Sequence, residues 1–151
     1  MGHTERRNIN RGFLKLEVWN DAIELYKSVF KLLNRIPHLD FKLKNQLLDA
    51  SQSISANIAE GYCRKSINEY LYFLNVALGS CGEVLTRLIG LKEIQLISKE
   101  TYEEIDKLHY EVENKLLALI KSLQAKRVEG NWDDQIHEPN SVYSNIPRLH
   151  I

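Results

Sequence analysis

Residues 53–66 read SISANIAEGYCRKS, and this stretch decides the fold of the chain. Its small side chains, Ala56 and Ala59 above all, allow a neighbouring helix to approach closely. Gly61 suits the left-handed conformation that ends many helices. Ser66, with a glutamate three residues later, makes a capping box that begins another helix. The stretch therefore predicts two closely packed helices joined by a short basic turn.

Outward from this stretch, apolar residues recur at alternating spacings of three and four, which is the pattern of amphipathic helices. Four such stripes cover residues 16–33, 43–61, 67–88 and 102–123. Pro37 stops the first helix, while Asp40 and Ser98 are placed to cap the second and the fourth. Because the connections are short, neighbouring helices are expected to run antiparallel in up-down order. The sequence thus predicts an all-α fold, an antiparallel up-down four-helix bundle with an irregular C-terminal tail.

Composition divides the chain into three parts. Residues 1–15 form a polar N-terminal arm, residues 16–124 the bundle, and residues 125–151 a tail in which Gly130, Pro139 and Pro147 break any helix. Scattered apolar residues in the tail leave two alternatives open. The tail is either an extension free of the bundle or a strap packed on its own or a neighbouring bundle.

The charge balance restricts the partners of the chain. Of its 151 residues, 20 are Lys or Arg and 20 are Asp or Glu, so no overall field attracts nucleic acid or anionic lipid. Any such binding must use a local patch. No segment is read as a membrane span, and we expect a cytoplasmic protein without a membrane partner. The two cysteines, Cys63 and Cys81, are expected to be reduced thiols, because the helix between them holds them too far apart for a disulfide.

Catalytic and metal-binding patterns do not emerge. A di-iron site in a helical bundle needs a Glu-x-x-His pair on each of two helices, and only Asp106 with His109 imitates that spacing. His109 is more simply paired with Glu113, one helical turn later. Gly79 and Gly82 lie within a helix, without the lysine and strand of a phosphate-binding loop, and are read as points of close helix approach. We therefore expect no catalytic residue, no metal, no cofactor and no small-molecule substrate.

Two groups of residues remain as candidates for binding and assembly. The basic group, a candidate nucleic-acid site, consists of Arg6, Arg7, Arg11, Lys15, Arg64 and Lys65. The second group, a signature of helix packing and oligomer contacts, consists of Ala56, Asn57, Ala59, Glu60 and Gly61, with Glu60 placed to pair with Arg64 or Lys65. Apolar surface at Tyr70, Phe73, Tyr102 and Leu117 exceeds what one four-helix core is expected to cover, which indicates self-association.

With these residues in view, the chain resembles the four-helix bundle family associated with intervening sequences inside large-subunit ribosomal RNA genes. The resemblance rests on Leu16-Glu17-Val18-Trp19, on residues 53–66 with their Ile58-Ala59-Glu60-Gly61 core, and on residues 69–80. Members of this family resemble the accessory variability proteins of diversity-generating retroelements. That resemblance implies a ring of five subunits that helps a reverse transcriptase handle RNA. This chain differs from those basic accessory proteins in being neutral overall.

Two functions are therefore expected. The first is a non-enzymatic homopentameric adaptor that binds structured RNA, or a reverse transcriptase, through repeated basic residues. The second is a structural scaffold for protein–protein assembly that does not bind nucleic acid. Binding of RNA that weakens with salt separates the two, because phosphate contacts release counterions.

Overall fold

A computed structural model describes residues 6–130, and in this range the chain contains helices and no strands. A short 3-10 helix, η1 (Ile9–Lys15), precedes four α-helices. These are α1 (Glu17–Arg35), α2 (Phe41–Tyr62), α3 (Ile67–Glu93) and α4 (Lys99–Glu129). The predicted all-α fold with four long helices is confirmed, whereas η1 was not expected within the polar arm. The fourth helix also continues through residues 125–129, which the sequence had assigned to the tail. The remainder of that tail lies outside the described residues.

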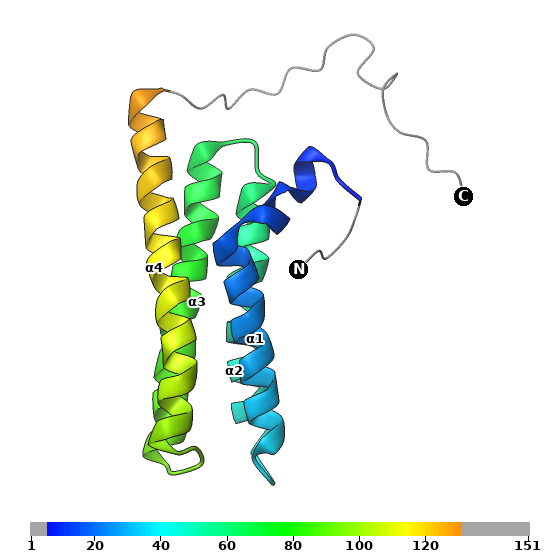
Figure 1. Cartoon of the computed structure of the whole chain (residues 1–151), viewed down its shortest axis with the longest axis vertical. Helices are drawn as coiled ribbons and strands as arrows, with labels where there is room; N and C mark the ends of the chain where they lie inside the picture. Colours follow the sequence, from blue (N-terminus) through cyan, green and yellow to red (C-terminus); the bar gives the residue numbers. More distant parts are fainter. Residues whose placement is uncertain (1–5, 131–151) are drawn as a thin grey trace, which may run out of the picture.

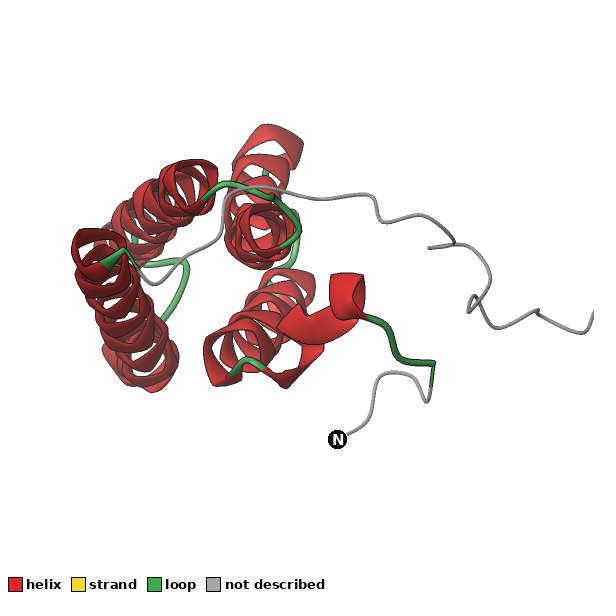
Figure 2. Ribbon diagram, turned by 90° about the horizontal axis from the view of Figure 1, so that it is seen from above, coloured by secondary structure: helices red, strands yellow, loops and turns green. Residues whose placement is uncertain are grey.

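The four helices form an up-down bundle around one core (Figures 1 and 2). α1 packs against α2 and α4, and α3 packs against α2 and α4, so each helix has two neighbours. The core is built from the predicted stripes. Its largest fully buried side chains are Leu25, Leu33, Leu47, Ile54, Ile58, Leu74, Leu88 and Leu116. Burial of such apolar side chains is the main term that stabilises the bundle.

Three predicted helix caps are present. The side chain of Asp40 accepts a hydrogen bond from the backbone N–H of Leu43 at 3.1 Å. Ser98 accepts one from the backbone N–H of Thr101, also at 3.1 Å. At the start of α3, the side chain of Ser66 accepts hydrogen bonds from the backbone N–H groups of Asn68 and Glu69. Each cap satisfies a donor that the first turn of a helix leaves unpaired.

Gly61 has a different role from the predicted one. It does not end a helix in a left-handed conformation, because α2 continues to Tyr62. Among the described glycines, the positive φ belongs to Gly130 and not to Gly61. Gly61 is buried instead against α3. A Cβ atom added there would lie 2.9 Å from Cβ of Phe73 and 3.1 Å from the carbonyl oxygen of Tyr70. Only a residue without a side chain lets α2 and α3 approach this closely.

The contact between α2 and α3 follows a helix face that does not carry the predicted alanines Ala56 and Ala59. Ser53 and Ser80 share a hydrogen bond of 2.8 Å between their Oγ atoms, and Asn57 donates to the carbonyl oxygen of Ser53 at 2.8 Å. Ser53, Asn57 and Gly61 are spaced by four and lie on one helix face. Ala56 is exposed and Ala59 is half-buried. The prediction of a close contact at Ala56 was therefore wrong.

Two further glycines also differ from the sequence interpretation. Gly79 and Gly82 are exposed on α3, and an added Cβ atom at either would meet nothing within 4 Å. They are not points of close approach in the bundle. α3 is also the one described helix that is long and apolar enough, by length and composition, to cross a membrane. The core helix of a bundle meets the same criterion, and ten residues of α3 are buried here.

The glycines give a matched pair of substitutions for testing this packing. Gly61→Ala should lower the free energy of unfolding by about 1–3 kcal/mol, because the new methyl group meets backbone and Cβ atoms that cannot move aside. Gly79→Ala should raise it by about 0.5–1 kcal/mol, because alanine restricts the unfolded chain and meets no neighbour. Urea unfolding followed by circular dichroism measures both. Equal shifts of the two midpoints would contradict the assigned close approach at Gly61.

Candidate nucleic-acid interface

The N-terminal arm is attached to the bundle at the C-terminal end of α2. Phe13 of η1 packs edge-on against two rings, Trp19 of α1 at 5.3 Å between centroids and Tyr62 of α2 at 6.3 Å. Tyr62 in turn packs edge-on against Tyr70 of α3 at 6.0 Å. Edge-to-face pairs of this kind stabilise by about 0.5–1.5 kcal/mol each beyond their buried area. The row of four aromatic rings therefore joins η1 to three helices of the bundle.

Polar contacts fix the arm in the same place. The side-chain amide of Asn20 donates to the carbonyl oxygens of Leu14 at 3.0 Å and Leu16 at 2.9 Å, which holds the turn between η1 and α1. The thiol of Cys63 donates to the carbonyl oxygen of Asn10 at 3.2 Å. Gly12 lies against the ring of Tyr62, where an added Cβ atom would collide with the hydroxyl group. The charged residues of the arm consequently occupy a defined position on the bundle.

Cys63 is a free thiol, as is Cys81. Basic neighbours such as Arg64 lower the pKa of a thiol when their field dominates. Here burial raises the pKa of Cys63 above its ordinary value. Burial also raises the pKa of Cys81, to about 12. Burial thus opposes formation of the thiolate at both cysteines, and Cys63 contacts the arm through Asn10.

The turn between α2 and α3 carries the second predicted basic group. Arg64 pairs with Glu60 at 2.7 Å, as the sequence predicted, and its guanidinium group lies 4.8 Å from the centre of the Phe73 ring. Lys65 is exposed beside it. The pairing neutralises one of the two cations locally, so Lys65 presents the freer positive charge of this turn. Surface pairs of this type contribute about 0–1 kcal/mol to stability.

The end of α4 adds basic residues that the sequence interpretation missed. Arg127 donates to the side-chain oxygen of Asn68 at 3.1 Å, which places the last turns of α4 beside the start of α3. Lys121 and Lys126 are exposed on these turns. Lys126 lies eleven residues after Lys115, a separation that brings two residues to the same helix face. The missed signal was the basic stretch at residues 121–127, which had been divided between the bundle and the tail.

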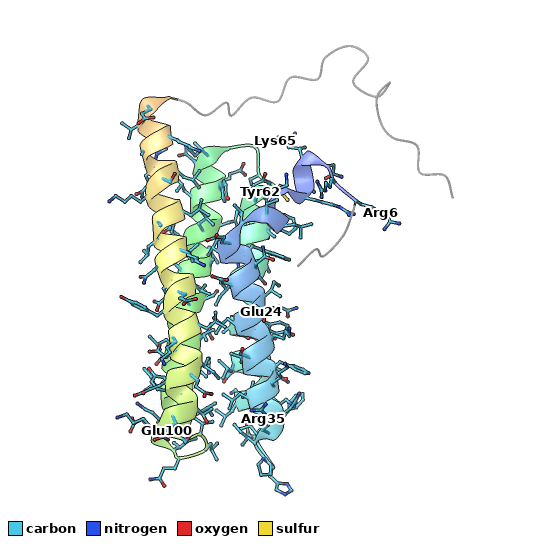
Figure 3. All side chains as sticks on the ribbon, in the orientation of Figure 1. Arg6, Glu24, Arg35, Tyr62, Lys65 and Glu100 are labelled. Carbon is cyan, nitrogen blue, oxygen red and sulfur yellow. The ribbon has the colours of Figure 1, made fainter. Side chains whose placement is uncertain are left out.

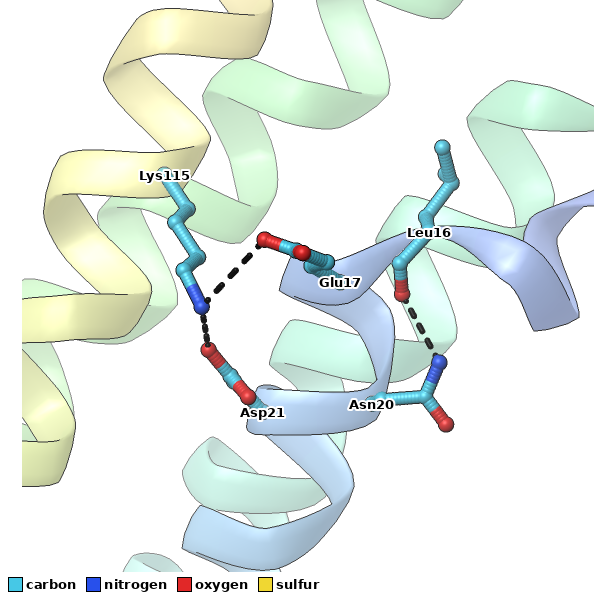
Figure 4. A network of polar contacts seen from close by, with 5 residues as sticks. All are labelled: Leu16, Glu17, Asn20, Asp21 and Lys115. Atoms are coloured by element: carbon cyan, nitrogen blue, oxygen red, sulfur yellow. Dashed lines mark hydrogen bonds and ion pairs between the residues drawn. The ribbon is translucent and has the colours of Figure 1, made fainter. Parts of the chain in front are cut away.

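The contacts of Lys115 show the direction of the α4 face that carries Lys115 and Lys126. The ammonium group of Lys115 pairs with Asp21 and lies 3.6 Å from Glu17, both in the first turns of α1 (Figure 4). The hydrogen bond with Asp21 is the main reason why the pKa of Lys115 is raised. This contact ties α4 to α1 just below the arm. The face of α4 that carries Lys115 and Lys126 is therefore turned toward α1.

These contacts bring three basic segments to one end of the bundle (Figure 3). We call this surface the basic end; it consists of Arg6, Arg7, Arg11, Lys15, Arg64, Lys65, Lys121, Lys126 and Arg127. Eight of these residues are exposed and Arg11 is half-buried. Residues 6–16 contain four of the cations and no acidic residue. Nine cations thus lie at one end of a neutral chain, together with the exposed acidic residues Glu60, Glu69 and Glu129, and cations are the groups that attract phosphate.

The packing signature divides between core and surface. Asn57 is half-buried and hydrogen-bonded within α2, Gly61 is buried at α3, and Glu60 is exposed and paired with Arg64. Ala56 is exposed and Ala59 packs at the edge of the core. Of these five residues, Gly61 lies directly against α3, while Asn57 acts through Ser53, whose hydroxyl group bonds to Ser80 of α3.

The predicted pairing of His109 with Glu113 is present, but in an unexpected place. Nδ1 of His109 lies 2.9 Å from Oε1 of Glu113, and Nε2 lies 2.7 Å from the carbonyl oxygen of Cys81. The ring is fully buried between α3 and α4. The contact with Glu113 has the distance of an ion pair without the geometry of a hydrogen bond. Within residues 6–130, no group of three or more potential metal ligands lies together.

Comparison with known proteins agrees with this architecture. The profile of the family described as 23S rRNA-intervening sequence protein matches residues 14–118. A crystal structure of a protein of unknown function from the S23 ribosomal protein family of Bacteroides thetaiotaomicron VPI-5482 is 28% identical in sequence, with a TM-score of 0.64. The match covers 69% of this chain and 98% of that one. No curated protein matches significantly. The chain belongs to the 23S rRNA-intervening sequence protein family, as its resemblance implied.

Attachment of the arm can be tested by proteolysis. Tyr62→Ala should release η1, because it removes the ring between Phe13 and Tyr70 and leaves the arm without its central contact. Trypsin should then cleave after Arg11 or Lys15 at least several times faster than in the unchanged protein, since cleavage follows local opening. Mass spectrometry of the early fragments measures this. Tyr72→Ala, at an exposed tyrosine of α3, is the control and should not change the rate.

Proposed function

We propose that this member of the 23S rRNA-intervening sequence protein family is a non-enzymatic homo-oligomer that binds structured RNA through the basic end. The single observation that carries the proposal is the position of the arm. Its four cations, without an acidic residue among them, are held at the C-terminal end of α2, where Asn10 contacts Cys63 two residues before Lys65. Folding gathers charges that are far apart in the sequence, and phosphate groups are the ligands that such a surface attracts.

Contacts of this kind favour sequence-tolerant binding. Lysine and arginine side chains on an exposed surface reach phosphate oxygens, which carry no base identity. One subunit offers a small number of such contacts and therefore weak affinity. Repetition of the basic end in an oligomer multiplies the phosphates that one RNA can contact together, and affinity grows with each of them.

Exposed apolar residues support self-association, although only Leu117 of the four first predicted is among them. Tyr70 is buried, Phe73 is covered by Arg64, and the ring of Tyr102 lies 4.5 Å from Nζ of Lys92. Leu117 is exposed as predicted, at 49%, and Tyr110 on the same helix is exposed at 62%. Large apolar side chains in such positions are typical of subunit contacts. A ring of five subunits is the assembly that the family resemblance implies.

More specifically, we propose that the protein acts as an accessory protein or adaptor of a reverse transcriptase. This role rests on the resemblance to retroelement accessory proteins and would use the same surface, because an enzyme that copies RNA delivers that RNA to its partner. We further propose that the protein acts in the cytoplasm and without a cofactor or small-molecule substrate.

A protein scaffold is the second candidate, and a specific surface favours it. At the end of the bundle opposite the arm, an apolar groove lies between the start of α2 and the end of α3. Its lining includes Leu43, Leu47, Leu91 and Ile94, beside Gly90. Leu43 and Ile94 are exposed, at 39% and 59%. A groove of this kind could accept an apolar segment of another protein.

Salt-dependent RNA binding decides between the two. A five-site variant, with Gln in place of Arg6, Arg7, Arg11, Arg64 and Lys65, should lose most of its affinity for a structured RNA at low salt. The slope of log affinity against log salt should become shallower by about 0.7–0.9 for each phosphate contact removed. Fluorescence anisotropy with a labelled hairpin measures both quantities. Circular dichroism and light scattering must show unchanged helicity and mass.

A matched control variant removes the same number of positive charges from another part of the bundle. Gln at Lys27, Lys31, Arg35, Lys42 and Lys99 removes five cations that lie outside the basic end. This control should retain most of the binding and most of the slope. If the unchanged protein does not bind RNA at low salt, or if both variants bind alike, the scaffold becomes the better proposal.

Oligomer mass is the second measurement. Multi-angle light scattering at micromolar concentration should give a multiple of the 17.6 kDa subunit, with five subunits expected. Leu117→Glu should reduce the mass, because it places a charge on an apolar contact, without lowering helicity. A 17.6 kDa particle in the unchanged protein would overturn both the oligomer and the argument from repeated contacts.

A further inference from the structure

The longest helix, α4, carries its exposed large apolar side chains on a single row. Tyr110, Leu117 and Val128 are exposed at 62%, 49% and 85%. They are separated by seven and eleven residues, which are close to two and three whole turns, so they share one face. Lys107 and Lys121 are exposed on the same face. Because α4 packs against α1 and α3 with its other sides, none of the described helices covers this face, which we call the α4 row.

The neighbouring helix α3 has a second uncovered face. Tyr72, Val76, Gly79 and Glu83 are all exposed, and their spacings of four, three and four place them on one side of the helix. Glu69 precedes them by one turn. Residues 70–82 of α3 contain no charged residue. A helix face that meets only water is ordinarily rich in charge, so this one has the composition of a contact surface. We call it the α3 face.

Contacts within one subunit show which positions of the two helices lie at equal height. Nε2 of His109 lies 2.7 Å from the carbonyl oxygen of Cys81, and Arg127 donates to the side chain of Asn68. α3 and α4 run antiparallel side by side (Figure 1), so a step up one helix matches an equal step back along the other. To within a turn, the pairs at equal height are Leu117 with Val76, Asn114 with Gly79, Lys107 with Glu83 and Lys121 with Glu69.

These pairs are complementary in chemistry. Leu117 and Val76 are both apolar, while each lysine of the α4 row is level with a glutamate of the α3 face. Within the described part of the chain, no ion pair involves Lys107 or Lys121. Glu83 shares its carboxylate with Arg87 of its own helix at 3.0 Å. Two subunits that stand side by side at the same height therefore bring apolar groups together, flanked by opposite charges.

We propose that the α4 row of one subunit packs on the α3 face of a second copy of this chain, with both copies pointing the same way. The inference rests on the homo-oligomer of the proposed function, because it names the surfaces through which the subunits meet. A rotation axis parallel to the helices generates this arrangement and places the basic ends of all copies on the same side of the assembly. One RNA can then contact several basic ends together.

Disulfide cross-linking between two single variants tests this contact. Asn114→Cys and Gly79→Cys place thiols at exposed positions in the middle of the two surfaces. An added Cβ atom at Gly79 meets nothing within 4 Å. Both variants also carry Cys63→Ser, because Cys63 is exposed, whereas Cys81 is buried and can stay. After co-expression with tags of different size and oxidation, a non-reducing gel should show a covalent dimer that contains both tags.

The matched control replaces Gly79→Cys by Gly90→Cys. Gly90 is exposed on the same side of α3, and an added Cβ atom there also meets nothing within 4 Å. It lies eleven residues further along, about 16 Å from Gly79, whereas a disulfide joins Cα atoms about 7 Å apart or less. The mixed dimer should therefore form at least about fivefold less with Gly90→Cys. Asn114→Cys without a partner variant should give no covalent dimer.

Each outcome decides the proposal. A mixed dimer with Gly79→Cys and little with Gly90→Cys supports it. Equal yields at the two glycines would assign the cross-link to random collision, and cross-linking of Asn114→Cys with itself would place α4 against α4; either result overturns it.

The comparison also separates this inference from the proposed function. If light scattering shows an oligomer but no mixed dimer forms, the interface is wrong and the oligomer stands. If the mixed dimer forms but RNA never binds, the interface stands and the RNA function is wrong. A 17.6 kDa particle in light scattering would overturn the oligomer and the interface together.

Discussion

The close approach of α2 to α3 at Gly61 is the constraint on which the rest of the structure depends. With no side chain at this position, the end of α2 lies directly on Tyr70 and Phe73 of α3. That contact determines where the following turn and Tyr62 are placed. Tyr62 receives Phe13 and Gly12 of the arm, and the turn carries Arg64 and Lys65. A larger residue at Gly61 would thus disturb the core and the basic end together, because the same atoms position both.

Much of the fold could be predicted because its signals are local. Apolar stripes, the caps at Asp40, Ser66 and Ser98, and the pairing of Glu60 with Arg64 all involve residues a few positions apart. The sequence alone does not show which small residue of α2 contacts the neighbouring helix. Ala56 and Gly61 are both compatible with close packing, and only the rotation of α2 about its axis decides that Gly61 is buried and Ala56 exposed. That rotation is set by the whole core.

The candidate site was predicted in part for the same reason. The arm and the turn at Arg64 could be found as clusters in the sequence, but Lys121, Lys126 and Arg127 belong to the site only because α4 runs antiparallel to α3 and extends to Glu129. His109 illustrates a related limit. Its spacing to Glu113 predicted the pair, yet nothing local indicates that the ring would be fully buried against the carbonyl oxygen of Cys81. The contact of Nε2 with the carbonyl oxygen of Cys81 joins α4 to α3, which gives this histidine, the buried one among the described residues, a structural role.

Basic residues at the end of α4 also have a structural explanation, which must be weighed against the functional one. Cations near a helix C-terminus and acids near its N-terminus stabilise the helix dipole, and α4 has Glu100 in its first turn and Lys126 and Arg127 in its last. These residues alone would therefore indicate little about RNA. The arm is different. Arg6 and Arg7 precede η1 and belong to no last helical turn, yet aromatic and hydrogen-bonded contacts hold the segment that follows them against the bundle. Since folding holds these cations near Lys65 against their mutual repulsion, an external anion that neutralises them would account for the arrangement.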